Sequence, residues 1–183
     1  MRAVNLALRV TASLALLVTT SLAAQTPASV TGTLTVDTTT VKLNSASAFS
    51  YPGGTGGYVS VLLSDKPANP KSFAEYTRIG AGERYRPATF MQAWSTIHAD
   101  GGLSGLTFSV SVDARNQVDT NYVLVGGLKK MFGLSSDDLV LEVKSVSPRF
   151  TGRIRSKQPV LDLGARKVSL DATFDVAATT PGK

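Results

Sequence analysis

The stretch RFTGRIRSKQPVLDLGARKVSLDATFD, Arg149 to Asp175, decides the predicted fold because two parts of it alternate with a period of two residues. In the first part, Arg149 to Lys157, every charged residue stands at an odd position. In the second part, Lys167 to Val176, apolar residues alternate with polar ones, and both aspartates stand at odd positions. Successive side chains of a β-strand point to opposite faces, so each part predicts a strand with one apolar face.

The two parts can pair as an antiparallel hairpin in a register that satisfies both faces. Cross-strand charge pairs and aromatic pairs stabilise a sheet by about 0.2–1 kcal/mol each. The charged residues of the first part, Arg149, Arg153, Arg155 and Lys157, form a basic stripe on one face. We interpret this stripe as mainly structural, and we expect no binding to heparin at about 150 mM salt. The alternative is a stripe that grips a phosphate backbone, lipopolysaccharide or an acidic glycan. The predicted pairs are Arg149 with Asp175, Arg153 with Asp171, Thr151 with Thr173, Phe150 with Phe174, and Ile154 with Leu170.

The rest of the chain also favours strands joined by turns, without a strand-helix-strand rhythm. One segment differs: Pro87 to His98 places its apolar residues at helical spacing and predicts a short helix, and Ser72 to Thr77 can add a helical turn. We predict a mainly β protein, a single antiparallel β-sandwich or barrel of about eight strands with one short helix. The remaining predicted strands are Val30–Asp37, Val41–Phe49, Tyr58–Ser64, Leu106–Val112, Val118–Val125 and Leu139–Val146.

The N-terminus has the order of a secretory signal peptide. Arg2 and Arg9 precede an apolar run, and small residues follow up to Ala24. The apolar run is shorter than the roughly 20 residues of a membrane-spanning helix, which disfavours the alternative of a permanent anchor. We expect residues 1–24 to be a signal peptide, 25–29 a short linker, 30–176 the β domain and 177–183 a flexible tail.

Composition sets further limits on location and partners. The chain has no cysteine, so it offers no thiol for lipidation and no disulfide, and we expect a secreted or periplasmic protein that is not a lipoprotein. Without the two arginines of the leader, 17 basic residues face 13 acidic ones, a net charge of +4. This modest charge makes nucleic acid an unlikely partner in our interpretation.

The glycine-rich segment Gly53 to Gly57 is a candidate for a phosphate-binding loop. Such loops open a helix, whose free N–H groups face the phosphate. Here the cluster precedes the predicted strand Tyr58–Ser64, and no Lys-Ser or Lys-Thr pair follows. We interpret it as a turn.

The catalytic options are few. His98 is the single histidine, and the segment Gly102 to Gly105 misses the spacing of a serine nucleophile elbow by one place. No alternating Asp/Asn ladder for calcium occurs. We therefore predict no catalytic residues, no metal site and no cofactor. The one type of catalysis that the sequence still permits is acid-base chemistry by carboxylates.

Candidate ligand-binding residues come from two places. The sequence predicts a long loop from Lys66 to Arg86, in which tyrosines lie among arginines. Long loops on a β scaffold often carry functional residues. Two cations of the basic stripe have no partner in the predicted hairpin. The candidates are Tyr76, Arg78, Arg84, Tyr85 and Arg86 in the loop, and Arg155 and Lys157 in the stripe.

Three short patterns resemble a group of uncharacterised exported bacterial β-rich domains. They are the run from Gly32 to Val36, the strand-turn sequence VSVLLSDKP from Val59 to Pro67, and a Gly-Arg strand followed by a strand with Phe-Asp, here Gly152–Arg153 and Phe174–Asp175. The resemblance implies a bacterial exported origin and one β domain, and it brings no activity.

These observations predict a non-enzymatic binding or interaction module of the cell envelope or extracellular space, with an envelope glycan or a protein as partner. The alternative is a hydrolase that acts through carboxylates on an envelope or extracellular polysaccharide. Raised carboxylate pKa values in a cleft would favour the enzyme.

The signal-peptide interpretation predicts the N-terminus of the mature protein. Protein isolated from its host should begin at Ala24 or Gln25, because cleavage follows the small residues that end the leader. Intact-mass measurement checks this, and a mature protein that retains Met1 would contradict it.

Overall fold

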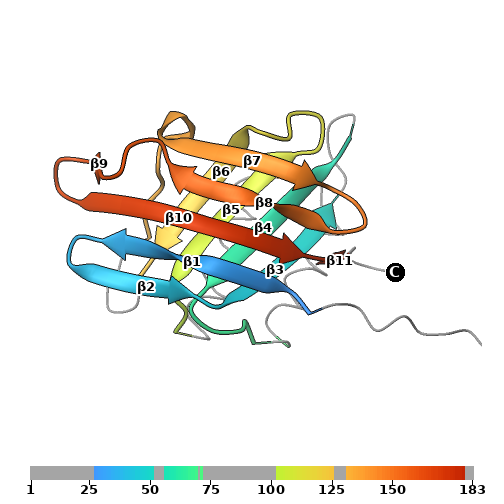
Figure 1. The fold of residues 1–183 in the computed structure, drawn as a ribbon, viewed down its shortest axis with the longest axis horizontal. Helices are drawn as coiled ribbons and strands as arrows, with labels where there is room; N and C mark the ends of the chain where they lie inside the picture. The colour runs from blue at the N-terminus through green and yellow to red at the C-terminus, as the bar shows by residue number, and fades with distance from the viewer. Residues whose placement is uncertain (1–26, 52–55, 70, 72–101, 126–130, 180–183) are drawn as a thin grey trace, which may run out of the picture.

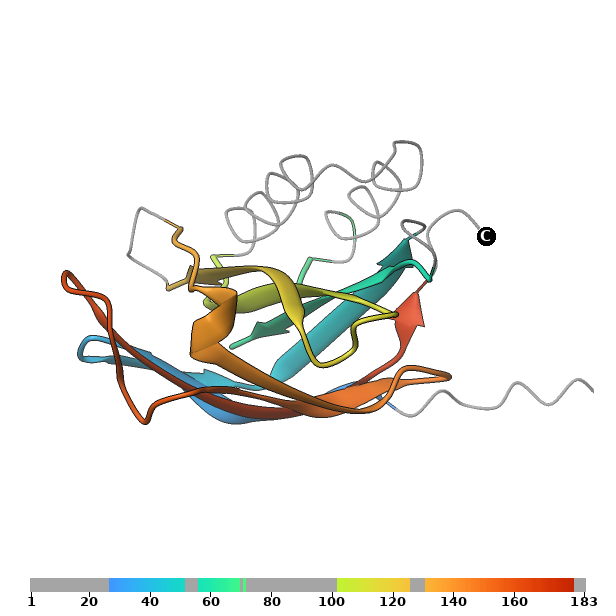
Figure 2. The same ribbon diagram turned by 90° about the horizontal axis from the view of Figure 1, so that it is seen from above.

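The computed structural model describes residues 27–51, 56–69, 71, 102–125 and 131–179. In these residues the chain forms two open β-sheets that pack face to face, with strands that cross at an angle (Figures 1 and 2). The prediction of a mainly β sandwich is confirmed. The predicted helix Pro87 to His98 and the turn Ser72 to Thr77 lie outside the described residues.

The six-stranded sheet has the order β2-β1-β10-β8-β7, and β9 pairs with the first residues of β10. All of its pairs are antiparallel. The ten-residue strand β10 lies between β1 and β8, so segments from the two ends of the domain form its centre (Figure 1). The strands are β1 (Ser29–Val36), β2 (Thr39–Leu43), β7 (Leu139–Ser145), β8 (Phe150–Ser156), β9 (Leu161–Asp162) and β10 (Lys167–Val176).

The five-stranded sheet has the order β11-β3-β4-β5-β6. Its centre is β4, in which every residue from Val59 to Ser64 is buried. The pair of β11 with β3 is parallel, and the other pairs are antiparallel. The strands are β3 (Ser45–Tyr51), β4 (Tyr58–Ser64), β5 (Gly105–Ser111), β6 (Val118–Leu124) and β11 (Ala178–Thr179), and a short 3-10 helix, η1 (Ser136–Asp138), precedes β7.

The prediction of one strand from Val41 to Phe49 is wrong. The chain passes from the six-stranded to the five-stranded sheet at Asn44, which separates β2 from β3. The Asn44 N–H donates to the Ser64 carbonyl at 2.8 Å, and its side-chain amide donates to the Asp65 carbonyl at 3.3 Å. These bonds hold the corner, and the strand on each side of it buries its own apolar residues.

The sandwich core is centred on aromatic rings from both sheets. The ring of Phe174 in β10 lies 5.4 Å from that of Phe150 in β8 and 5.7 Å from that of Phe108 in β5, centroid to centroid. All three side chains are at most 2 % exposed. Each ring removes a large apolar area from water, so this cluster joins the two sheets.

The register of β8 with β10 corrects the predicted hairpin by two residues. Phe174 lies opposite Gly152 rather than Phe150, and Asp171 lies opposite Arg155 rather than Arg153. A Cβ atom at position 152 would lie 3.1 Å from the Phe174 ring and 2.6 Å from the Glu142 carbonyl oxygen. Glycine therefore makes room for the ring beside β7. A shift by two residues keeps every side chain on its predicted face.

We predict that Phe174→Ala lowers the free energy of unfolding by about 3–5 kcal/mol, because it opens a cavity between Phe150 and Phe108. Urea unfolding of the folded variant measures the loss. Thr173→Ala, the adjacent residue on the exposed face of β10, is the matched control and should change stability little. Equal losses in the two variants would contradict this account of the core.

Candidate functional site

The outward face of the six-stranded sheet carries an ordered array of polar side chains. Alternation in β1 turns Thr31 and Thr33 outward, and alternation in β10 does the same for Ser169 and Asp171. The outward side chains of β8 are Thr151 and two arginines of the basic stripe, Arg153 and Arg155. Hydroxyl groups, carboxylates and cations thus lie in neighbouring rows on one face.

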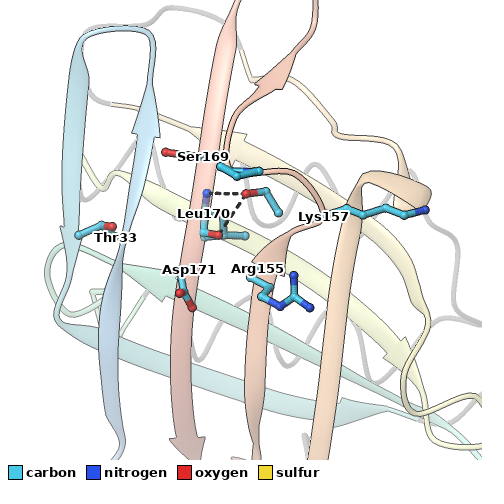
Figure 3. A pocket seen from close by; sticks show the side chains of 8 residues that line it. Thr33, Arg155, Lys157, Ser169, Leu170 and Asp171 are labelled. Atoms are coloured by element: carbon cyan, nitrogen blue, oxygen red, sulfur yellow. Dashed lines mark hydrogen bonds between the residues drawn. The ribbon is translucent and has the colours of Figure 1, made fainter.

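Two hollows interrupt this face. The first, of about 350 Å³, is lined by Thr33, Ser169, Asp171, Arg155, Lys157 and Pro159 (Figure 3). The second, of about 640 Å³, is lined by Thr31, Thr33, Glu142, Lys144, Arg153 and Asp171. Because both share Thr33 and Asp171, the two hollows adjoin each other across β1, β10, β8 and β7, and together we call them the trough.

Asp171 forms the best-defined ion pair of the trough. Arg153 donates to its two carboxylate oxygens from Nε at 2.8 Å and from Nη2 at 2.6 Å. This hydrogen bond lowers the pKa of Asp171, and the same contact raises the pKa of Arg153. Asp171 is therefore a carboxylate at neutral pH, and a group with a lowered pKa makes a poor proton donor.

Arg149 has a structural role at the end of β8. Its side chain forms an ion pair with Asp175, and it also donates to the backbone carbonyls of Pro27 at 3.1 Å and Asp175 at 3.0 Å. The predicted contacts of Arg149 with Asp175 and of Arg153 with Asp171 are both present. Because the register is shifted by two residues, each of these contacts joins side chains that are diagonal neighbours on the two strands rather than directly opposite each other.

The two predicted stripe residues Arg155 and Lys157 both line the first hollow (Figure 3). Arg155 has an ion-pair partner that the hairpin did not supply: Glu142 of β7, with Nε and Oε1 3.8 Å apart. This distance exceeds that of a hydrogen bond. Within the described ranges, the exposed Lys157 ammonium has no ion-pair partner. Its backbone N–H donates to the Asp138 carbonyl at 2.8 Å, which fixes the strand end.

Several candidates of the sequence analysis lie outside the described residues. These are the loop candidates Tyr76, Arg78, Arg84, Tyr85 and Arg86, together with His98. Their part in a site with Arg155 and Lys157 therefore stays a prediction. The sequence analysis did not include the outward threonine hydroxyls of β1, the hydroxyl row of the trough, among the candidates. The alternation Thr31-x-Thr33-x-Thr35 indicates that these threonines share one face.

Ser104, the serine of the segment Gly102 to Gly105, lies in a structural position rather than a catalytic one. Ser104 is 7 % exposed, and its backbone N–H donates to Asp65 Oδ1 at 2.9 Å. It directly precedes β5, whereas a nucleophile elbow joins a strand to a helix. No group of three or more His, Cys, Asp or Glu residues in the described part of the chain is arranged to hold a metal ion.

The outward face of the five-stranded sheet differs because its side chains are buried. It carries Phe49, Leu62 and the rings of Tyr51 and Tyr58, which stack with centroids 5.5 Å apart. Ser60 and Ser109 join their hydroxyls there at 3.2 Å. The trough is therefore the better-exposed candidate site.

Comparison with known proteins brings no relative. No protein-family model matches the chain, no curated protein does, and no solved structure does. The resemblance to exported bacterial β-rich domains stays a prediction. Among the described residues, no helix is long and apolar enough to cross a membrane.

The lowered pKa of Asp171 predicts a pH dependence of stability. A carboxylate with a pKa below its ordinary value of 3.8 stabilises the fold above that value, and this contribution is lost as the pH falls through the lowered pKa. The difference in unfolding free energy between wild type and Asp171→Asn should therefore be present at pH 6 and shrink below about pH 4. Urea unfolding across this range measures it.

Arg153→Gln removes the other partner and should reproduce the same pH dependence, without a further loss in the double variant. A difference between wild type and Asp171→Asn that grows as the pH falls would contradict the assignment.

Proposed function

We propose that the protein is a non-enzymatic binding module of the cell envelope or extracellular space, and that the trough holds an extended ligand against the six-stranded sheet. The observation that carries this proposal is that the two hollows adjoin across four strands, with Thr33 and Asp171 shared between them. A ligand laid along such a depression meets hydroxyl, carboxylate and cationic groups in succession. This variety of donors and acceptors suits a polar polymer, such as an envelope glycan.

The carboxylates of the trough favour binding over hydrolysis. Glycosidases need one carboxyl group that keeps its proton near neutral pH. Asp171 has a lowered pKa because Arg153 binds both of its oxygens, and Glu142 lies beside Arg155. Both carboxylates thus serve the ion pairs of the sheet.

The location in this proposal rests on the leader pattern that ends at Ala24 and on the lack of cysteine. The choice against nucleic acid rests on the paired arginines. Arg149 and Arg153, half of the cations in the basic stripe, each bind an aspartate. A phosphate backbone would need these charges free.

The proposal predicts that filling the trough abolishes binding. Thr33→Tyr places a bulky ring at the junction of the two hollows and should weaken retention on polysaccharide at least tenfold. Thr40→Tyr is the matched control, since Thr40 is exposed on β2 and lines neither hollow. Affinity electrophoresis in gels with polygalacturonate or neutral dextran, and co-sedimentation with peptidoglycan sacculi, measure retention. Circular dichroism checks that both variants fold.

Retention of wild type on none of these probes would overturn the proposal, as would equal retention of the two tyrosine variants. Release of reducing sugar from a retained polysaccharide, lost in Asp171→Asn, would replace binding by the hydrolase alternative.

A further inference from the structure

The cationic end of the trough has unused hydrogen-bonding capacity. Arg155 is the last outward residue of β8, and Lys157 directly follows the end of that strand at Ser156. Arg155 carries five N–H donors; its ion-pair partner Glu142 lies 3.8 Å away, and its charge also acts on Asp171. The Lys157 ammonium has no ion-pair partner within the described ranges. Both side chains line the first hollow (Figure 3), and Pro159 adds an apolar side chain to its lining.

Two hydroxyl groups line the same hollow as these cations. Thr33 of β1 and Ser169 of β10 line it, and no hydrogen bond within the described part of the chain uses either hydroxyl. A hydroxyl both donates and accepts, as the hydroxyls of a sugar do. The hollow thus combines cations for an acidic substituent with groups that match a sugar ring.

Fixed negative charges limit how much anionic charge the trough can accept. Asp171 lies at its centre, and Glu142 lines its second hollow. Arg153 is occupied by Asp171, so its charge is already compensated. A ligand with several charges on each unit would bring them close to these carboxylates, and like charges repel. A ligand with one charge on each unit can direct that charge to Arg155 or Lys157.

We infer that the ligand of the trough is a sparsely charged acidic glycan, a chain of sugars with one carboxylate on each unit, held by Arg155 and Lys157 through its carboxylates and by Thr33 and Ser169 through its hydroxyls. This inference rests on the proposed function and adds the chemical class of the ligand. It also agrees with the expectation that heparin, a denser polyanion, is not retained at about 150 mM salt.

The experiment compares polygalacturonate oligomers with their methyl esters, which keep the sugar backbone and lose the charge. Isothermal titration measures both affinities at about 150 mM salt, the physiological screening range. Wild type should bind the acid form at least tenfold more tightly than the ester. The variant Arg155→Gln/Lys157→Gln should lose at least tenfold for the acid form and change little for the ester.

A matched control removes the same two charges elsewhere. Arg115→Gln/Lys167→Gln changes one arginine and one lysine that are exposed and lie outside both hollows. Its affinity for the acid form should stay within twofold of wild type. An equal loss in the control would show that net charge, rather than the trough, attracts the polymer, and it would overturn the inference.

The remaining outcomes separate this inference from the proposed function. Equal binding of ester and acid, still abolished by Thr33→Tyr, would refute the acidic ligand and leave the binding module standing. Tighter binding of heparin or DNA than of polygalacturonate at about 150 mM salt would assign the trough to dense polyanions and overturn the inference. Binding of no probe, charged or neutral, would overturn both.

Discussion

The position of β10 is the constraint on which the rest of the structure depends. This strand pairs with β1 along one edge and with β8 along the other, so it joins the two ends of the domain. Its even residues, Phe174 among them, face the core, and its odd residues, Asp171 among them, face the trough. A slip by one residue would expose the aromatic cluster, so the burial of Phe174 also fixes which side chains reach the ligand surface.

The two-residue register shift links core packing to the electrostatics of the exposed face. Because Phe174 fits over Gly152, Asp171 lies directly opposite Arg155. Arg153 nevertheless reaches diagonally to Asp171, and Arg155 turns to the more distant Glu142 of β7. One arginine is thus bound firmly and the next weakly. The packing of one ring therefore leaves Arg155, beside Lys157, as a weakly compensated cation in the first hollow.

Local patterns in the sequence predicted the faces of the strands but not their partners. Period-two alternation assigned Arg155 and Lys157 to the exposed face, because it depends only on neighbouring residues. The register of β8 depends on the space beside Gly152, which involves the Glu142 carbonyl of another strand. The pairing of β1 with β10 joins segments more than 130 residues apart, and no local signal marks it. The threonines of β1 reach the same hollow as the cations only through this pairing, so their role in the site could not be predicted.

The edges of the six-stranded sheet explain why its face is the better place for a partner. A free edge strand presents N–H and C=O groups that pair with any extended chain. On β7, however, the Val143 N–H donates to Asn116 Oδ1 at 3.0 Å, and at the other end the Leu139 N–H donates to the Ser136 carbonyl of η1. The opposite edge, β2, has five residues before the chain turns away at Asn44. Backbone pairing with a partner is therefore restricted at both edges, whereas the face offers side chains alone. A ligand of this face must bring its own donors, acceptors and charge, and a polar polymer does so at regular spacing.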